Sequence, residues 1–184
     1  MIMNFKLFKL RVKIAYYFLT GKINRSIPQL ELSHEGHDSR KVLFMFPLDE
    51  PSFRVAAYSF RNLGQSAKDL NDYTYLVKEE FNHLFTNRKG EIKLLKSSLK
   101  KPHKISTMSA VLNNLRSSEY DMVIDLNTEF HLDASRILSH IPARLKVGFC
   151  SNFSDLFYNI QLDVSKSGIT ENGYHKVHTM LEAL

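Results

Sequence analysis

The side chains best placed for chemistry are polar groups that end or directly follow two strongly apolar runs, VLFMF at 42–46 and MVIDL at 122–126. They are Asp49, Glu50, Asp125, Asn127 and Glu129. A carboxylate at the mouth of a sheet can activate a hydroxyl as a general base, or it can accept hydrogen bonds from sugar hydroxyls. Carboxylates also cap helices and hold turns, which is the favoured role for Asp49 and Glu50. Asp125 is expected to hold backbone amides of the turn that follows it.

Other kinds of chemistry lack their motifs. The seven glycines form neither GxGxxG nor a phosphate-binding loop, and there is no GxSxG serine elbow. Two histidine pairs, His34 with His37 and His175 with His178, have no adjacent cluster of further ligands, so we interpret them as surface histidines. We therefore predict no metal and no cofactor. The single cysteine, Cys150, excludes an intramolecular disulfide and is expected to be a small buried residue.

The positive charge of the chain is concentrated at its N-terminus. The protein has 184 residues, of which 43% are hydrophobic and 24% charged, as in an ordinary globular domain. Its net charge of +6 equals the six basic residues of 1–25, where there is no acidic residue, and the other 19 basic residues balance all 19 acidic ones. A neutral domain whose basic segment has no recognised nucleic-acid motif is not expected to bind nucleic acid.

Residues 3–19 are predicted to form an amphipathic helix that places Lys6, Lys9 and Lys13 on one face. A basic helix with aromatic residues can lie in an anionic membrane interface, so these lysines are candidate membrane contacts. Equally, the helix can pack its wide apolar side on its own domain or on a second copy of the chain, and both interpretations stay open. The lysines interrupt the apolar run, so this helix is expected neither to span a membrane nor to direct export.

We expect three parts in the chain: a basic helical segment at 1–25, a polar linker at 26–39 and a single domain at 40–184. Buried strands alternate with helices in this domain, which predicts an α/β, Rossmann-like parallel sheet with helices on both faces. Strands are expected at 42–46, 73–77, 92–95, 122–126 and 145–149; helices at 52–62, 106–116, 132–140 and 172–184; a helix or turn at 79–84; and a solvated basic loop at 100–104. Ligands of such sheets bind beyond the carboxyl ends of the strands.

Two stretches of this domain resemble a known family. EYDMVIDLNTEF at 119–130, followed by a helix and then by IPARLKVGF at 141–149, resembles the heptosyltransferases of lipopolysaccharide biosynthesis, glycosyltransferase family 9. In that family a "YDLVIDL" strand, a helix and an "RIGF" strand follow one another in the N-terminal domain. The resemblance covers about residues 40–165 and implies the acceptor-side half of a two-domain GT-B transferase.

Two departures limit what the resemblance implies. In the family, the first strand is followed by a Gly-Asp pair whose aspartate serves as the base, whereas Pro51 and Ser52 stand there in this sequence. Asp49 or Glu50 could supply the base from a shifted loop. The chain ends before the donor-binding C-terminal domain of the family would begin, so independent glycosyl transfer is not expected. The candidate acceptor-binding residues that the resemblance implies are Ser52, Asn127 and Glu129.

The favoured function is therefore a non-catalytic, glycosyltransferase-like module that binds a glycan, a lipid-linked sugar or a protein partner near a membrane surface. The alternative is the acceptor-side domain of a glycosyltransferase whose donor domain comes from another chain. Both place the protein in the bacterial cytoplasm, with contact at the inner membrane if residues 1–25 bind lipid. A second copy of the chain is a further candidate partner.

Overall fold

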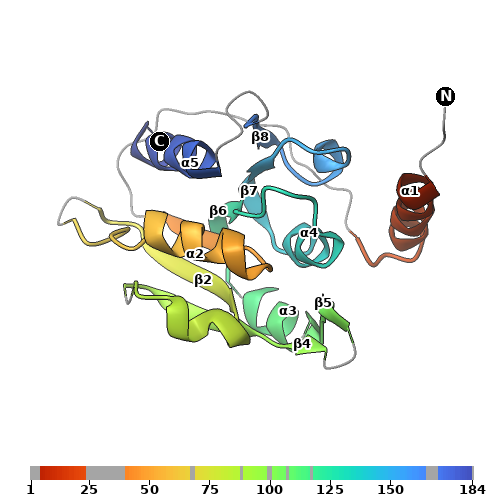
Figure 1. Cartoon of the computed structure of the whole chain (residues 1–184), viewed down its shortest axis with the longest axis horizontal. Coiled ribbons are helices and arrows are strands. Elements are labelled where there is room, and N and C mark those ends of the chain that lie inside the picture. The colour runs from red at the N-terminus through yellow and green to blue at the C-terminus, as the bar shows by residue number, and fades with distance from the viewer. Residues whose placement is uncertain are drawn as a thin grey trace.

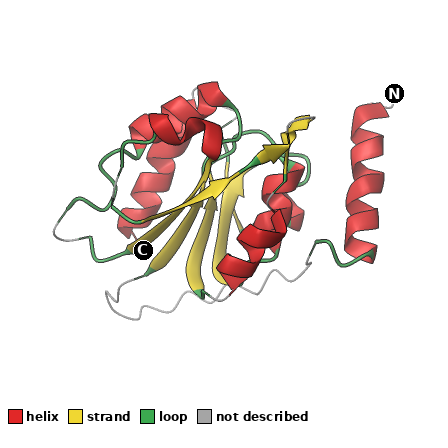
Figure 2. Ribbon diagram, turned by 90° about the horizontal axis from the view of Figure 1, so that it is seen from below, coloured by secondary structure: helices red, strands yellow, loops and turns green. Residues whose placement is uncertain are grey.

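A six-stranded parallel β-sheet forms the centre of the protein (Figures 1 and 2). The computed structural model describes residues 5–23, 40–66, 69–87, 89–98, 101–106, 108–116, 118–164 and 170–183. The strand order is β3-β2-β1-β6-β7-β8, and each neighbouring pair is parallel. The strands are β1 (Lys41–Met45), β2 (Asp72–Lys78), β3 (Glu91–Leu95), β6 (Tyr120–Asp125), β7 (Ala143–Phe149) and β8 (Ile160–Leu162).

Helices cover both faces of this sheet (Figure 1). They are α1 (Phe5–Leu19), α2 (Glu50–Ser59), α3 (Met108–Arg116), α4 (Leu132–Ser139), α5 (Thr170–Ala183) and the 3-10 helices η1 (Glu79–Leu84) and η2 (Ser154–Leu156). Buried side chains of α2, α5 and η1 join one core cluster, and those of α1, α3 and α4 join the cluster on the opposite face. The predicted Rossmann-like fold with helices on both faces is confirmed.

The run VLFMF forms a strand because it is enclosed on all sides. Val42 to Phe46 are all 0% exposed, since β1 lies between β2 and β6 and is covered on both faces. Beneath α2 and α5 the core is rich in aromatic rings. The Phe46 ring centroid lies 4.9 Å from that of Phe85 and 5.6 Å from that of Phe53. Such tilted and edge-on contacts add to the free energy gained by burying these large side chains.

The first helix of the domain begins two residues before its predicted start. The carboxylate of Asp49 accepts a hydrogen bond from the Ser52 N–H (2.9 Å), which caps the N-terminus of α2. Pro51 lies in the first turn, where its missing N–H costs no helical hydrogen bond. The helix ends at Ser59, and Gly64, with φ +76, supports the turn beyond it. The expected capping role of Asp49 is confirmed.

Three local expectations are corrected by the structure. Lys101–Ile105 forms strand β5, which pairs antiparallel with β4 (Ser97–Ser98), so the predicted basic loop is part of a small two-stranded sheet. The six-stranded sheet also contains β8, a strand that the sequence pattern does not indicate. Cys150 is exposed rather than buried, because it directly follows β7 beyond the covered part of the sheet. The predicted linker at 26–39, with His34 and His37, lies outside the described residues.

Helix α1 packs on the domain through one side. Ile14 is 3% exposed and joins the core cluster that contains α3 and α4. The Phe18 ring stacks on Phe157 (6.3 Å between centroids), and the Arg136 guanidinium of α4 lies 4.4 Å from the centre of the Tyr17 ring. Of the two uses predicted for this helix, the structure therefore shows packing on its own domain. No helix in the described ranges has the length and apolar character needed to cross a bilayer.

Candidate functional site

The predicted site lies between β1 and β6, where the strand order reverses. The chain crosses from β1 to β2 on one side and from β6 to β7 on the other. Met45 is in register with Asp125, and the Leu126 N–H donates to the Met45 carbonyl at 2.9 Å. The loops that leave the two carboxyl ends therefore lie side by side. In open α/β sheets such a reversal is where ligands bind.

Asp125 is the buried centre of this edge, with 2% of its surface exposed. Its Oδ1 accepts hydrogen bonds from the backbone N–H and the side-chain amide of Asn127, at 2.9 and 2.6 Å. Its Oδ2 accepts a hydrogen bond from the Tyr158 hydroxyl at 2.5 Å. The Asn127 Oδ1 in turn accepts from the Leu48 N–H (3.0 Å), so the network ties together the loops after β1 and β6. The predicted structural role of Asp125 is confirmed.

The surroundings of Asp125 also set its ionisation. Burial raises the pKa of this carboxyl, while the hydrogen bonds from Tyr158 and Asn127 oppose that rise by stabilising the carboxylate. Burial, followed by the charge of Asp125, raises the pKa of the Tyr158 hydroxyl well above its ordinary value. Both groups are enclosed, and the Tyr158 oxygen lies 3.3 Å from Ser135 Oγ. A carboxyl group so enclosed cannot reach the hydroxyl of a ligand, so it holds the loops in place.

A glycine makes room for the tyrosine of this network. A Cβ atom at Gly148 in β7 would lie 2.5 Å from Cε2 and 2.6 Å from Cδ2 of Tyr158. These ring atoms are fixed by the contacts around Tyr158, so they cannot move aside without loss of the Asp125 hydrogen bond. The glycine of the LKVGF run therefore has a packing role. Tyr158 is not among the predicted site residues, because nothing in the sequence pairs it with an aspartate 33 residues away.

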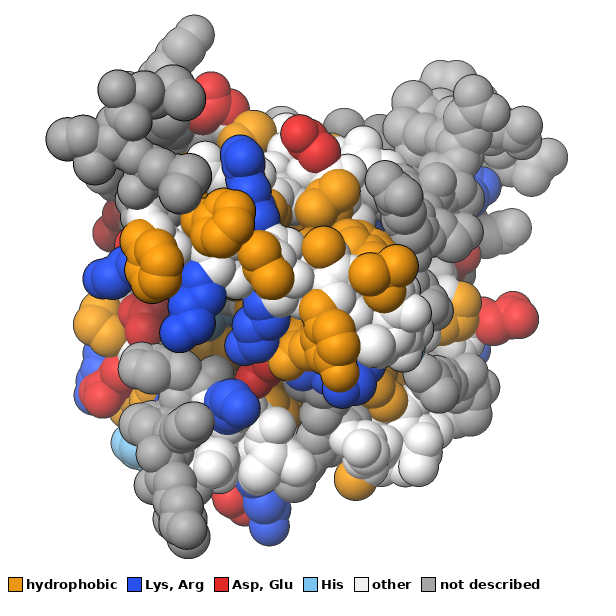
Figure 3. Space-filling model, turned by 90° about the vertical axis from the view of Figure 1, so that its right-hand side faces the viewer, with side chains coloured by type: hydrophobic (Ala, Val, Ile, Leu, Met, Phe, Trp, Pro, Cys, Tyr) orange, Lys and Arg blue, Asp and Glu red, His pale blue; other side chains and the backbone are white. Residues whose placement is uncertain are grey.

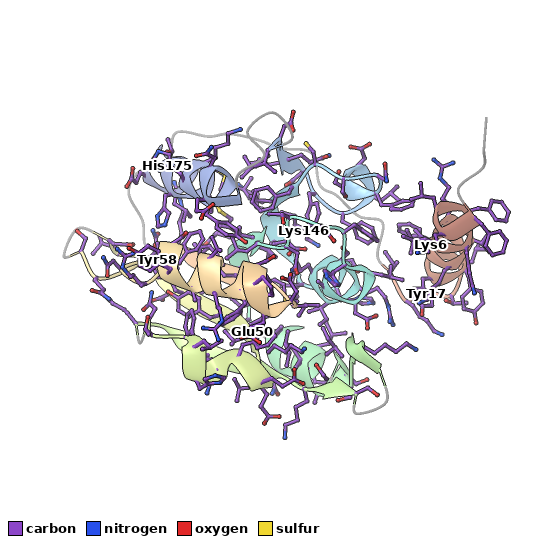
Figure 4. The ribbon with its side chains drawn as sticks, viewed as in Figure 1. Lys6, Tyr17, Glu50, Tyr58, Lys146 and His175 are labelled. Carbon is purple, nitrogen blue, oxygen red and sulfur yellow. The ribbon has the colours of Figure 1, made fainter. Side chains whose placement is uncertain are left out.

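The three predicted residues at the start of α2 are held by local contacts (Figure 4 labels Glu50 at this end of the helix). Asp49 is exposed and caps the helix through Ser52 N–H. Glu50 is exposed and pairs with Arg54 one turn later, at 2.7 Å. Ser52 is half-buried beside them. The structure thus brings Asp49, Glu50 and Ser52 to the carboxyl edge, where Asp49 and Glu50 are both exposed.

The remaining predicted residues follow β6. Asn127 is 6% exposed, and both ends of its amide are used inside the protein, by Leu48 and Asp125. Glu129 is exposed in the same loop. Of these two, only Glu129 therefore presents its side chain to solvent.

Tyr174 of α5 joins this edge from the end of the chain. Its hydroxyl donates to the Leu126 carbonyl at 3.1 Å, next to Asp125. The pKa of Tyr174 is raised first by burial and then by the negative charges of Asp49, Asp125 and Glu171, which places all three acids near this hydroxyl. The sequence predicts a closing helix here but does not indicate that its tyrosine reaches the site.

The electrostatics of the edge are acidic. Asp49 and Glu50 occupy the N-terminus of α2, the position at which a helix would otherwise bind a phosphate. Within the described ranges, no group of three His, Cys, Asp or Glu side chains could hold a metal ion.

His178 is half-buried rather than a surface residue: its ring stacks on Phe60 (4.5 Å), and its Nε2 lies 3.0 Å from the Ser59 carbonyl oxygen. His175 is exposed, as predicted.

Solved glycosyltransferase structures share this fold. A glycosyl transferase family 9 protein from Veillonella parvula DSM 2008 matches with a TM-score of 0.60 and 14% identity, over 78% of this chain and 41% of that chain. The E. coli heptosyltransferase WaaC with ADP matches with a TM-score of 0.57 and 14% identity, over 76% and 46%. No protein-family model and no curated protein sequence matches the chain. The chain spans less than half the length of either structure, and it has the α/β fold of these glycosyltransferase family 9 structures over that part.

Proposed function

We propose that this protein is a non-catalytic, glycosyltransferase-like module that binds a glycan or a lipid-linked sugar at the carboxyl edge of its sheet, near a membrane surface. The observation that carries the proposal is that the candidate carboxylates already have partners inside the protein. Asp125 is enclosed by Tyr158 and Asn127, Asp49 caps α2, and Glu50 is paired with Arg54. Each of these carboxylates contacts a group of the protein itself, whereas a general base needs the hydroxyl of a ligand within hydrogen-bond reach.

The edge suits a neutral, hydroxyl-rich ligand better than a phosphorylated one. Exposed carboxylates such as Asp49 and Glu129 can accept hydrogen bonds from neighbouring sugar hydroxyls. A diphosphate would meet negative charge there, and the helix N-terminus that could hold it is already occupied by Asp49. The fold shared with glycosyltransferase family 9 structures supports a role connected with sugars.

A glycan array followed by calorimetric titration tests this function. We expect a neutral oligosaccharide or a lipid-linked sugar to bind, and the combined Asp49→Ala and Glu129→Ala variant to bind it at least about tenfold more weakly, since two hydrogen-bonded contacts are lost. The matched control is Glu119→Ala with Glu182→Ala, which removes two exposed acids elsewhere on the chain. Circular dichroism shows whether each variant is folded, because Asp49→Ala also removes a helix cap.

The alternative is an acceptor-side domain that works with a donor domain from another chain. One observation favours it: Asp49 remains exposed at the carboxyl edge, close enough for its charge to act on Tyr174. In that case nucleotide-diphosphate sugars would bind in the presence of the partner chain, and Asp49→Ala would abolish sugar transfer. Sugar transfer that depends on Asp49 would overturn the non-catalytic proposal, whereas glycan binding without transfer supports it.

A further inference from the structure

Helix α1 has two apolar sides, and only one of them is covered. The inner side holds Ile14, which is 3% exposed, together with the half-buried Tyr17 and Phe18, and it packs on the domain beside α4 and η2. The adjoining apolar side of the helix faces solvent. An amphipathic helix needs only one apolar side to pack on its own domain, so the exposed second side requires a separate explanation.

The outer side carries a continuous stripe of large apolar residues (Figure 3). They are Phe5, Phe8, Val12, Tyr16 and Leu19, with exposed fractions of 72%, 47%, 53%, 53% and 88%. Their spacing of three and four residues places them on one face of the helix. Of the eight large hydrophobic residues that are exposed in the described part of the chain, five belong to this stripe. Contiguous exposed apolar surface of this kind marks an interaction site.

The charges around the stripe indicate the chemistry of its partner. Lys6, Lys9 and Lys13 are exposed along one border of the stripe, and Arg11 is exposed along the other. There is no acidic residue in 1–25. Figure 3 shows basic and apolar side chains interleaved on this face of the protein. The complementary surface is therefore apolar within and negatively charged at its boundary, as in the interface of a bilayer that contains anionic lipid.

We propose that the outer stripe of α1 lies in the interface of an anionic bilayer while the inner side stays packed on the domain. The helix then needs no rearrangement to bind, because the residues that insert are not those that hold it in place. A groove of about 580 Å³ adjoins the stripe between α1 and residues 152–156, and it is lined by Phe18, Leu19, Phe153 and Leu156 among others. It continues the apolar surface to the segment that follows the carboxyl end of β7.

This proposal develops the membrane-surface part of the proposed function and does not depend on the identity of the glycan. The test is co-sedimentation of the full chain with vesicles of phosphatidylcholine alone and with vesicles of equimolar phosphatidylcholine and phosphatidylglycerol. We expect binding to the anionic vesicles, weakened by salt, and little binding to phosphatidylcholine alone. Glycan titration without vesicles is a separate measurement, so either proposal can fail while the other holds.

Two sets of variants separate charge from apolar insertion. Lys6→Gln, Lys9→Gln and Lys13→Gln together are expected to weaken vesicle binding about a hundredfold, at about fivefold for each lysine. Their matched control changes three exposed lysines outside α1 and is expected to weaken binding by less than about tenfold, since these residues lie away from the stripe. The control residues are Lys89, Lys104 and Lys176, each changed to Gln.

Phe5→Ser with Phe8→Ser is expected to weaken binding at least about tenfold, because two inserted rings are lost. The control is Tyr58→Ser on α2, whose ring is 67% exposed away from α1 (Figure 4) and which should bind as the wild type does. If wild-type protein does not bind the anionic vesicles, or if both sets bind like their controls, the proposal is wrong. It is also wrong if gel filtration shows a dimer that Phe5→Ser and Phe8→Ser convert to a monomer and vesicles do not bind, since a second copy then covers the stripe.

Discussion

Lys146 is a buried amine whose ionisation should appear in the stability of the protein. It lies in β7 with 5% of its surface exposed, and its Nζ donates to the carbonyls of Leu138 (3.0 Å) and Ser139 (3.4 Å) at the end of α4 (Figure 4). Burial lowers the pKa of this amine from its ordinary 10.5 to about 8. Between these two values the unfolded chain binds a proton that the folded protein releases, so the free energy of unfolding rises with pH.

The size of this effect follows from the two pKa values. Below pH 8 the amine is protonated in both states, and its desolvation reduces stability in full. The pKa of Lys146 is about 8 in the folded protein and 10.5 in the unfolded chain. With these two values, the free energy of unfolding should rise by about 2 kcal/mol between pH 7 and pH 9.5. The buried tyrosines act in the opposite direction at higher pH, because burial raises their pKa. The useful window therefore ends near pH 9.5.

Urea denaturation at several pH values measures this, with Lys146→Met as the comparison. Methionine fills a similar volume without a charge, so the difference between wild type and Lys146→Met should change by about 2 kcal/mol between pH 7 and pH 9.5. Lys176→Met, at an exposed lysine, controls for the general loss of a positive charge. Parallel pH profiles for wild type and Lys146→Met would refute the reasoning, because they would mean that the amine keeps its ordinary pKa in the folded protein.

Two further predictions concern the Asp125 network. Tyr158→Phe removes a hydrogen bond to a buried carboxyl and should lower the free energy of unfolding by about 1.5 to 3 kcal/mol near neutral pH. The folded-state pKa of Asp125 is raised, so this carboxyl favours folding most in acid, and removing the Tyr158 donor raises that pKa further. The loss in Tyr158→Phe should consequently be smaller at pH 4 than at pH 7, and an equal loss by urea denaturation at both would contradict a carboxylate partner. Gly148→Ala should cost about 1 to 3 kcal/mol, because the new Cβ meets the Tyr158 ring. In combination with Tyr158→Phe it should cost less than the sum, since both lose the same hydrogen bond; additive losses would show that the two sites act independently.

The sequence alone predicts the parts of this fold that depend on local pattern. VLFMF is apolar throughout, and MVIDL is apolar except for Asp125. A strand that is buried on both faces requires such a run, so the central parts of β1 and β6 are predicted. The capping role predicted for Asp49 is present in the structure, although the helix begins at Glu50 rather than at Ser52. The short edge strand β8 is not predicted, because its three half-buried residues have no run or alternation that distinguishes them from a loop.

The tertiary structure decides which residues meet. Asp125 is confined by Tyr158, and the loop after β6 is held by Tyr174, although both tyrosines lie far along the chain and carry no motif. The exposure of Cys150 depends on where β7 ends relative to its covering layers, which composition does not reveal. For α1, the sequence shows apolar residues on two sides of a basic helix, but only the packed domain determines that Ile14 is covered and that Phe5 and Leu19 are left outside. Periodicity fixes the faces of a helix, whereas long-range packing fixes which face is buried.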